Sequence, residues 1–537
     1  MNKSIQDIIV YQIYPKSFRD SNNDGIGDLQ GVISKLDYLS DLGVNAIWLS
    51  PIYDSPLDDN GYDISDYQSI LVQFGTMADF DQLLEQCKRR NIKVIMDLVI
   101  NHCSDEHIWF KESRKSKNNP YSNYFHWADG INGNPPNKWR SVFGGSAWEY
   151  SPERDQYYLH IFSKKQPDLN WSNPQLVNEI HSMIKWWLDK GIDGFRIDAI
   201  SFLEKPVDFH SCDSEDFATV PCANKTLGHS YIKGFMDIIN SYDAFSVGEV
   251  NEVTSEGILK YVAPAAGEFQ MAISFVPPEI EVFNDDLVSY YKEQLKTKLE
   301  IEQQGGWNAI FLSNHDKPRQ VSLFGDDAEE YWEDAAKALA VLVLTQKGTP
   351  FLYQGEEIGM TNCYFDTINK YHDLDTINKY NEKIEAGVQP DDAFRLVQLA
   401  SRDNGRTPIQ WNSDTYAGFS TVEPWLGINQ NKDTLNVELQ SQSPTSILSH
   451  YKNLILLRKE NQVLIEGHTK LLDLGKNIIA FERSLNDVRF IVIVNLSKEV
   501  TSIKAIDFHG LTTLMSNNFS NNNLSGYGYV IFKGIIL

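Results

Sequence analysis

Eight short runs of apolar residues recur along the chain, and most of them stand next to a segment with the apolar spacing of an amphipathic helix. Near-continuous apolar strands that alternate with helices are typical of a parallel sheet covered on both faces. Eight such units predict an α/β protein built on a (β/α)8 TIM barrel. The predicted strands are 7–14, 45–53, 93–102, 194–200, 244–250, 268–275, 308–316 and 348–358.

The spacing of these units is uneven after the third predicted strand. About 70 residues, rich in Asn, Pro, Gly, Trp and Tyr, precede the helix that leads to strand four. A structureless loop of that length is uncommon in a compact domain, so a small inserted domain is predicted over 103–171. After residue 460, short strands separated by turns predict a C-terminal all-β domain, a β-sandwich over 461–537. The barrel domain then comprises 1–102 and 172–460.

A second polar insertion, 365–392, follows the eighth predicted strand. It contains "DTINKY" twice, at 366–371 and again at 375–380. Two copies of six residues are far shorter than the repeats that build solenoids, so a local duplication is the simpler interpretation.

The charge balance limits the partners of the chain. It carries 48 basic and 73 acidic residues, a formal net charge of −25. Such a charge argues against binding nucleic acid through its phosphates and against docking on an anionic membrane. Neither kind of partner is therefore expected.

Targeting features and cysteine usage favour a cytoplasmic location. The N-terminal segment has no signal-peptide pattern, and the longest apolar run, 338–344, is too short to span a bilayer. The five cysteines are scattered, without the spacing of metal ligands or of a disulfide framework. A reduced, cytoplasmic protein is therefore expected.

The segment "GFRIDAI" at 194–200 places two charged residues in an apolar strand. Residues two apart in a strand point to the same side, so Arg196 and Asp198 share one face. Unpaired charges are costly to bury, which makes this pair a candidate for function.

Other predicted strands also end in polar residues. These residues are Asn101, His102, Glu249, Asn314, His315, Asp316, Gln354, Glu356 and Glu357. One acidic residue at a strand end is often a helix cap, but catalytic groups of a TIM barrel gather at the C-terminal ends of the strands. Three carboxylates from three strands suit glycoside hydrolysis, which needs two carboxyl groups beside the scissile bond. Metal-assisted hydrolysis is the alternative, but the sequence has no "HExxH" spacing.

The motifs of these strands resemble those of the α-amylase family of glycoside hydrolases. "DLVINH", "GFRIDAI", "VGEV" and "SNHD" follow one another in that family's order, and "QPDLNW" stands at 166–171. "YQIYPKSFRD", "DNGYDI", "FGGSAWEY", "YQGEEIGM" and "SRDNGRTPIQW" also match. The resemblance runs from about residue 8 to the C-terminus and is to the branch of oligo-1,6-glucosidases, dextran glucosidases and α-glucosidases.

The resemblance implies roles for individual residues. Asp198 matches the nucleophile, Glu249 the general acid and base, and Asp316 the third carboxylate. Such enzymes are retaining and act on the non-reducing end, which implies about 5–5.5 Å between the first two carboxyl groups. The remaining matches are Asp63 and Arg402 as the pair that closes the glucose pocket, His102 and His315 as hydroxyl-binding histidines, and Tyr62 as a stacking ring.

Arg196 has a predicted electrostatic role. A nearby cation lowers the pKa of a carboxyl group, so Arg196 is expected to hold Asp198 ionised and oriented. Glu249, without such a close cation, is expected to keep a raised pKa and its proton.

The stretch "DSNNDGIGD" at 20–28 resembles the start of a calcium loop. It is not an EF-hand, because position twelve is Gly31 and a strand precedes the loop. The matched family loop binds Ca²⁺, which here implies a structural site made by Asp20, Asn22, Asp24, Asp28 and the carbonyl of Ile26. The alternative is a plain Asx-rich turn.

The sequence is compatible with several substrate linkages. Ala199 follows the nucleophile, and with "GEVNEVT" at 248–254 it resembles α-1,4-glucosidases, so maltose-type substrates are expected. "SPIYDSPLDDNGYDI" instead resembles dextran glucosidases, which cut α-1,6 bonds. Lys317 keeps a trehalose-6-phosphate hydrolase open, whereas "KPRQVSLFGDD" lacks the Arg-rich loop of sucrose isomerases. A non-catalytic binding protein, like the transporter heavy chains of this fold, is disfavoured by the retained carboxylates.

Overall fold

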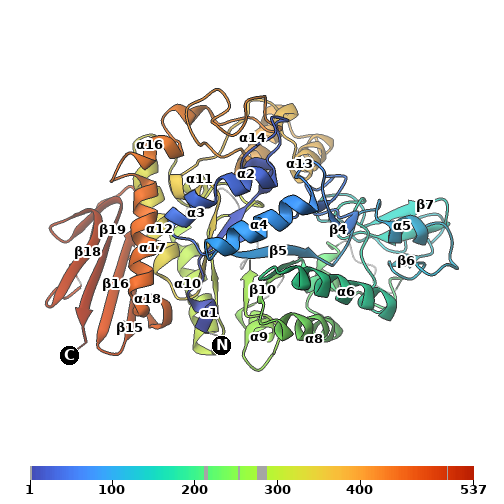
Figure 1. Ribbon diagram of the computed structural model, residues 1–537, viewed down its shortest axis with the longest axis horizontal. Coiled ribbons are helices and arrows are strands. Elements are labelled where there is room, and N and C mark those ends of the chain that lie inside the picture. The colour runs from blue at the N-terminus through green and yellow to red at the C-terminus, as the bar shows by residue number, and fades with distance from the viewer. Residues whose placement is uncertain (1–2, 211–215, 252–253, 275–286, 505, 537) are drawn as a thin grey trace.

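The computed structural model describes residues 3–210, 216–251, 254–274, 287–504 and 506–536 (Figure 1). Eight parallel strands form one sheet in the order β11-β10-β9-β5-β2-β1-β13-β12. A parallel bridge between Ala272 and Asn308 joins the two ends of this order and closes the barrel. The strands are β1 (Val10–Ile13), β2 (Ala46–Leu49), β5 (Lys93–Val99), β9 (Gly194–Asp198), β10 (Phe245–Val250), β11 (Met271–Ser274), β12 (Ala309–Ile310) and β13 (Thr349–Tyr353). The predicted TIM barrel is thus confirmed; the last residue of the predicted strand 268–275 lies outside the described residues.

Helices cover the outside of the barrel. They are α2 (Leu29–Ser34), α3 (Leu36–Leu42), α4 (Met77–Arg89), α6 (Pro174–Lys190), α8 (Thr226–Ser241), α9 (Ser255–Val262), α10 (Leu287–Gln303), α11 (Gln320–Phe324) and α12 (Trp332–Thr345). Helix α6 shows how the sequence sets their ends. The side chain of Asn173 accepts a hydrogen bond from the backbone N–H of Gln175, Pro174 opens the first turn, and Gly191 ends the helix in a left-handed conformation.

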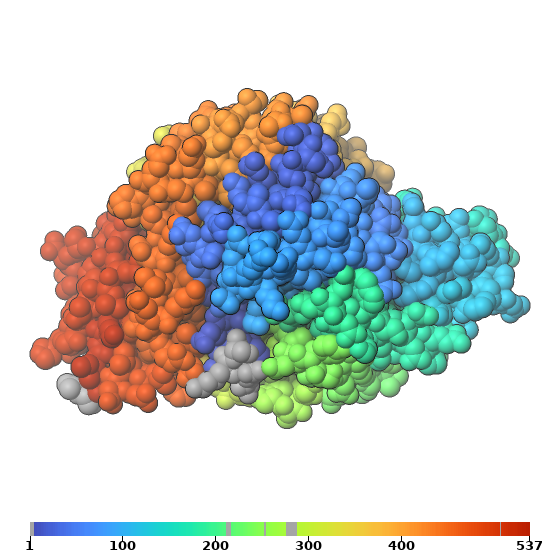
Figure 2. Space-filling model, viewed as in Figure 1, coloured from blue at the N-terminus to red at the C-terminus, as the bar shows by residue number. Residues whose placement is uncertain are grey.

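The segment between β5 and α6 contains helix α5 (Ile108–Ser113) and a three-stranded antiparallel sheet. Its strands β6 (Trp127–Ala128), β7 (Trp148–Ser151) and β8 (Gln156–Leu159) pair in the order β6-β8-β7. These elements lie at one side of the barrel in Figure 1, and their surface projects at the same side in Figure 2. An apolar cluster with Trp139 and Trp148 also contains Ala199 and Phe202, which follow β9. The segment therefore packs directly against the residues that follow the predicted nucleophile.

The polar insertion after β13 lies above the barrel mouth. The first "DTINKY" copy falls in a 3-10 turn (Ile368–Lys370), and the second copy is in α13 (Leu374–Glu385), which packs on α14 (Pro390–Ala400). The same six residues thus form different structures, because the second copy begins beside the N-cap residue Asp373. The other short helices are α1 (Lys3–Gln6), α7 (Thr219–Cys222), α15 (Asp403–Arg406), α16 (Val437–Ser441) and α18 (Gln462–Glu466), and β3 (Tyr53–Asp54) pairs with β4 (Asp66–Ile70).

The C-terminal part is all-β, as predicted. Its strands are β14 (His468–Leu472), β15 (Ile478–Leu485), β16 (Val488–Asn495), β17 (Thr501–Ser502), β18 (Leu511–Ser520) and β19 (Asn523–Ile535). All of them are antiparallel and belong to one six-stranded sheet, in place of the two stacked sheets of a sandwich. One face of this sheet contacts α12, which lies beside α17 (Ile447–Glu460). The helices supply the cover that a second sheet would otherwise provide.

No helix among the described residues is long and apolar enough to cross a membrane.

Candidate active site

Arg196 lies at the centre of a buried cluster of three carboxyl groups. Its Nη1 is 2.8 Å from Asp97 Oδ1 and 2.7 Å from Asp198 Oδ1, and its Nη2 contacts Glu249 Oε2. The strand register explains this arrangement, because Asp97 of β5 lies directly opposite Arg196 of β9. The charged pair in "GFRIDAI" is therefore not isolated: one guanidinium serves carboxyl groups from three neighbouring strands.

The expected electrostatic effect on Asp198 is not confirmed. Burial raises the pKa of Asp198 well above its ordinary value; Arg196 opposes this shift, and the carboxyl groups of Glu249 and Asp97 reinforce it. One guanidinium balances only one of three negative charges, and the three carboxyl groups are largely buried. Burial and the two neighbouring carboxyl groups therefore outweigh Arg196 in their effect on the pKa of Asp198.

The expectation that Glu249 lacks a close cation is wrong. Besides Arg196, Glu249 accepts hydrogen bonds from Asn251 Nδ2 at 3.1 Å and from the backbone N–H of Ala199 at 3.3 Å. The predicted barrel makes these two strands neighbours, but the error arose because the register between them, which decides whether Glu249 reaches Arg196, is not given by local sequence. The parallel register of these two strands brings Glu249 alongside the start of the loop after β9.

Asp316 faces three cationic or proton-donating groups. His315 Nε2 is 3.0 Å from Asp316 Oδ2, and Arg402 Nη1 and Arg406 Nη2 lie 3.3 and 2.9 Å from Oδ1. Burial would raise the pKa of Asp316, but His315 and the two guanidinium groups hold it well below its ordinary value. Asp316 is therefore the firmly ionised member of the three catalytic candidates.

The two predicted histidines and the predicted ring line one wall of the site. The rings of Tyr62 and His315 stack with their centres 5.1 Å apart, and Tyr62 donates a 2.9 Å hydrogen bond to Asp97. His102 Nε2 lies 3.1 Å from the carbonyl oxygen of Tyr62. Burial lowers the pKa of His102 to about 4, so its ring is neutral at pH 7.

Arg402 pairs with Asp59 and not with the predicted Asp63. Arg402 Nη2 lies 3.2 Å from Asp59 Oδ1 and 2.7 Å from Asp373 Oδ1. Asp63 instead accepts hydrogen bonds from the backbone N–H groups of Asp58 and Asp59, at 2.8 and 3.1 Å. Within "DDNGYD" the turn directs one carboxylate to the guanidinium and uses another to hold its own backbone. Asp63 therefore positions the loop, and Asp59 makes the ion pair with Arg402.

Four residues of the site were missed in the sequence: Asp59, Asp97, Asp373 and Arg406. For Asp97 a signal existed, since it is an aspartate inside the apolar run "KVIMDLV". Arg406 lies one helical turn after Arg402 in the quoted "SRDNGRTPIQW", so both can face one ligand. Asp59 stands in the quoted "DNGYDI" with the predicted pocket residue, whereas no comparable signal existed for Asp373.

The predicted calcium loop forms a compact Asx-rich turn. Asp20 accepts hydrogen bonds from the backbone N–H groups of Asn22, Asn23 and Gly25 at 3.0, 2.7 and 2.9 Å. Asp28 caps α2 through the N–H of Gly31, and Asp24 accepts from the N–H of Ile26. Oxygen donors of this kind suit Ca²⁺. Among the described residues, however, no group of three or more His, Cys, Asp or Glu side chains is gathered closely enough to hold a metal ion.

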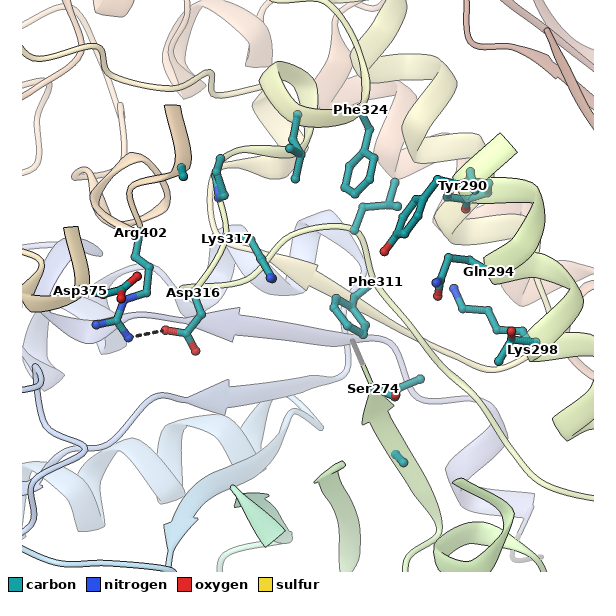
Figure 3. A pocket seen from close by; sticks show the side chains of 18 of the residues that line it. Ser274, Tyr290, Gln294, Lys298, Phe311, Asp316, Lys317, Phe324, Asp375 and Arg402 are labelled. Carbon is teal, nitrogen blue, oxygen red and sulfur yellow. Dashed lines mark hydrogen bonds and ion pairs between the residues drawn. The ribbon is translucent and has the colours of Figure 1, made fainter. Parts of the chain in front are cut away.

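A cavity of about 840 Å³ begins at Asp316, which is the one of the three catalytic candidates among its described lining residues (Figure 3). Asp316, Lys317, Asp375 and Arg402 line one end of it. Figure 3 shows Arg402 and Asp375 next to each other, with the Arg402 guanidinium directed at Asp316. The cavity therefore offers room for a group attached to a sugar held by Arg402 and Asp316.

Paired carboxyl groups at the C-terminal ends of neighbouring barrel strands, with an ionised Asp316 at the start of a cavity, are the arrangement of a glycoside hydrolase. The chain belongs to the α-amylase family: the model of the alpha amylase catalytic domain matches residues 12–467. It is 44% identical to an oligo-1,6-glucosidase of Parageobacillus thermoglucosidasius over 519 residues, which cover 94% of this chain and 92% of the relative.

Solved structures agree with this assignment. A variant of the isomaltulose synthase of Erwinia rhapontici NX5, in complex with sucrose, is 38% identical, with a TM-score of 0.94 and 99% of each chain covered. A variant of the trehalose-6-phosphate hydrolase of Bacillus licheniformis is 39% identical, with a TM-score of 0.92, covering 98% of this chain and 99% of that one. The protein is therefore an enzyme of the α-glucosidase type, and the non-catalytic alternative is set aside.

Proposed function

We propose that this protein is a retaining exo-α-glucosidase that releases glucose from the non-reducing end of short α-linked oligosaccharides. The observation that carries the proposal is the shared guanidinium of Arg196, which holds Asp198 and Glu249 side by side. Because both carboxyl groups contact the same guanidinium, they are held close together, as a retaining mechanism needs. An inverting mechanism needs a wider separation, with room for a water molecule between the sugar and one carboxyl group.

The residues then divide the chemistry. The Asp198 carboxylate attacks the anomeric carbon while Glu249 gives its proton to the leaving oxygen, and the glycosyl-enzyme forms. Glu249, now ionised, takes a proton from the incoming water, which attacks the same carbon and frees Asp198. Asp316, ionised by His315, Arg402 and Arg406, accepts hydrogen bonds from sugar hydroxyl groups.

Exo-action follows from the Asp59–Arg402 ion pair. Both side chains are mostly buried, and the pair links the loop between β3 and β4 to the start of α15. A bridge across one end of the pocket stops the chain of a long substrate from passing through. Only a terminal glucose then fits against Asp316.

An α-1,6 bond is the preferred linkage in this proposal. The relative named above is an oligo-1,6-glucosidase, and a second relative at 44% identity is a glucan 1,6-alpha-glucosidase of Streptococcus pneumoniae serotype 4, with 91% of each chain covered. The sequence argument for α-1,4 bonds loses weight because Ala199 is buried in an apolar cluster with Trp139 and Phe202. A small residue there is explained by packing. The other argument used 248–254, of which residues 252 and 253 lie outside the described residues.

A phosphorylated disaccharide is the second candidate substrate. Lys317 lines the cavity next to Asp316, on the side where the leaving group of the substrate would lie. An ammonium group there would favour an anionic leaving sugar over a neutral one.

Glucose release from isomaltose, maltose and trehalose 6-phosphate tests these assignments, measured beside Asp198→Asn. Preference for isomaltose, lost in the variant, supports the α-1,6 proposal and the nucleophile. Preference for maltose would instead support the α-1,4 interpretation of Ala199. Cleavage of trehalose 6-phosphate alone makes the phosphorylated substrate the function, and hydrolysis of none of the three contradicts the proposal.

A further inference from the structure

The cavity has a second end that the proposed reaction does not use. From Asp316 and Arg402 it continues along the outside of β11 and β12 to the inner face of α10. Ser274, Tyr290, Gln294 and Lys298 line this far part, which we call the Lys298 end. Figure 3 shows Gln294 and Lys298 next to each other, on the side of the cavity opposite Arg402.

Two polar groups at the Lys298 end have no hydrogen-bond partner within the described part of the chain. They are Ser274 Oγ and Gln294 Nε2, and both atoms are buried. Burial alone lowers the pKa of Lys298 to about 8, because no carboxylate among the described residues compensates for the lost water. Unpaired buried polar groups of this kind are rare in proteins and each asks for an explanation.

The chemistry of this end is that of a donor-rich, cationic pocket. Lys298 offers a positive charge, Gln294 an amide N–H, and the hydroxyl groups of Ser274 and Tyr290 can rotate to donate. Phe311 and Phe324 form apolar walls, and the Tyr290 and Phe324 rings stack with their centres 6.4 Å apart. Low-dielectric walls strengthen the attraction between an ammonium group and an anion.

We propose that the Lys298 end is a binding site for an oxyanion, with phosphate as the chemical class that fits it best. A phosphate group presents several acceptor oxygens and a negative charge to donors that have no other partner. Two sources of the phosphate fit the shape: a phosphate carried by a sugar that extends along the cavity from Asp316, and free inorganic phosphate. The site goes beyond the proposed hydrolysis and does not depend on which linkage is cut.

Binding of inorganic phosphate, followed by calorimetry, tests the site in the full-length protein. The wild type should bind phosphate, and Lys298→Met should bind it at least tenfold more weakly. The matched control is Lys296→Met, since Lys296 is exposed on the same helix and pairs with Glu293 at 2.9 Å. This control should bind as the wild type does. No binding by the wild type, or equal binding by Lys298→Met and Lys296→Met, would overturn the proposal.

Two further measurements keep the result unambiguous. Without phosphate, Lys298→Met should melt no lower than the wild type, because the variant removes an unpaired buried charge; a clear fall in Tm would mean that Lys298 has a structural partner and would count against the site. Gln294→Leu supplies a second variant, expected to weaken phosphate binding without changing charge.

Inhibition of hydrolysis distinguishes the two sources. If glucose 6-phosphate inhibits hydrolysis of a neutral substrate more strongly than glucose does, and if Lys298→Met abolishes this difference, the phosphate is carried by a sugar. Phosphate binding that leaves this competition unchanged assigns the site to the free anion. Failure of the wild type to hydrolyse any neutral disaccharide would contradict the proposed function and would leave the phosphate-binding result standing.

Discussion

The guanidinium of Arg196 lies 2.8 Å from Asp97, a carboxyl group that takes no direct part in the proposed chemistry. Asp97 is fixed in turn by hydrogen bonds from Tyr62 Oη at 2.9 Å and Trp48 Nε1 at 3.1 Å. It therefore anchors Arg196 from behind while Arg196 holds Asp198 and Glu249 in front. It also adds a negative charge that raises the pKa of Asp198.

The first prediction concerns Asp97→Asn. Arg196 loses one anchor, and a displacement of about 1 Å at the catalytic carboxyl groups can cost roughly 10²-fold in kcat. Loss of the neighbouring negative charge lowers the pKa of Asp198, so the acidic limb of the kcat/KM profile should move to lower pH. The profile of an aryl α-glucoside, measured beside the exposed control Asp66→Asn, checks both effects. An unchanged acidic limb would show that Asp97 acts on packing alone.

The second prediction separates Asp59 from Asp63. Asp59→Asn removes a charged contact of Arg402, so kcat/KM should fall by roughly 10- to 100-fold with little change in Tm. Asp63→Asn removes an acceptor for the N–H groups of residues 58 and 59 and should lower Tm more than Asp59→Asn does. Steady-state kinetics and thermal melts of the two variants check this. If Asp63→Asn instead lowers kcat/KM more and Asp59→Asn lowers Tm more, Asp63 is the pocket residue.

These two residues show where sequence information ends. The eight barrel strands could be predicted, because strands buried on both faces read as continuous apolar runs. The strand-end positions of Asp198 and Glu249 followed from the same pattern. Which carboxylate of "DDNGYD" reaches Arg402 depends on backbone geometry within one turn, and apolar periodicity carries no such information.

The electrostatics of the site depend on strand order for the same reason. The contact of Arg196 with Glu249 crosses from β9 to β10, and the contact with Asp97 crosses from β9 to β5. Local sequence predicts which side of a strand a residue faces, but the register between strands is a tertiary property. The expectation of a cation-free Glu249 was wrong because it considered each strand alone.

The third prediction concerns calcium, which we propose as a structural ion of the 20–28 loop. Added Ca²⁺ should raise Tm and a chelator should lower it, because an ion that binds only the folded state stabilises it. Asp24→Ala should remove this dependence with little other effect. Asp20→Ala should be less stable under all conditions, because Asp20 also accepts a 2.6 Å hydrogen bond from Ser420 Oγ. If neither Ca²⁺ nor a chelator changes the Tm of the wild type, the loop is a plain Asx turn.

The fourth prediction follows from Glu356, a fully buried carboxyl group behind the barrel mouth. Its oxygens accept hydrogen bonds from Ser313 Oγ at 3.1 Å, from the N–H of Tyr353 at 3.2 Å and from Tyr451 Oη at 3.0 Å. Burial nevertheless raises the pKa of Glu356 from 4.5 to about 7, since these contacts recover only part of the lost hydration. The folded protein thus prefers the protonated form.

The sign of the resulting pH dependence follows from linkage. A pKa that is higher in the folded state contributes stability that is fully present below pH 4.5 and is lost as pH rises through about 7. The difference corresponds to on the order of 3 kcal/mol. The free energy of unfolding of the wild type should therefore fall between pH 5 and 8 by up to about that amount from this group.

Glu356→Gln should flatten this slope, because its neutral amide has no proton to lose. The variant loses the acceptor for Tyr451 at every pH, at a cost of about 1 kcal/mol. The test therefore uses the slope of the unfolding free energy against pH and not its absolute value. Denaturant unfolding at several pH values, beside the exposed control Glu460→Gln, measures it. If both variants keep the wild-type slope of unfolding free energy against pH, Glu356 is ionised in the folded protein. Its hydrogen bonds then outweigh its burial.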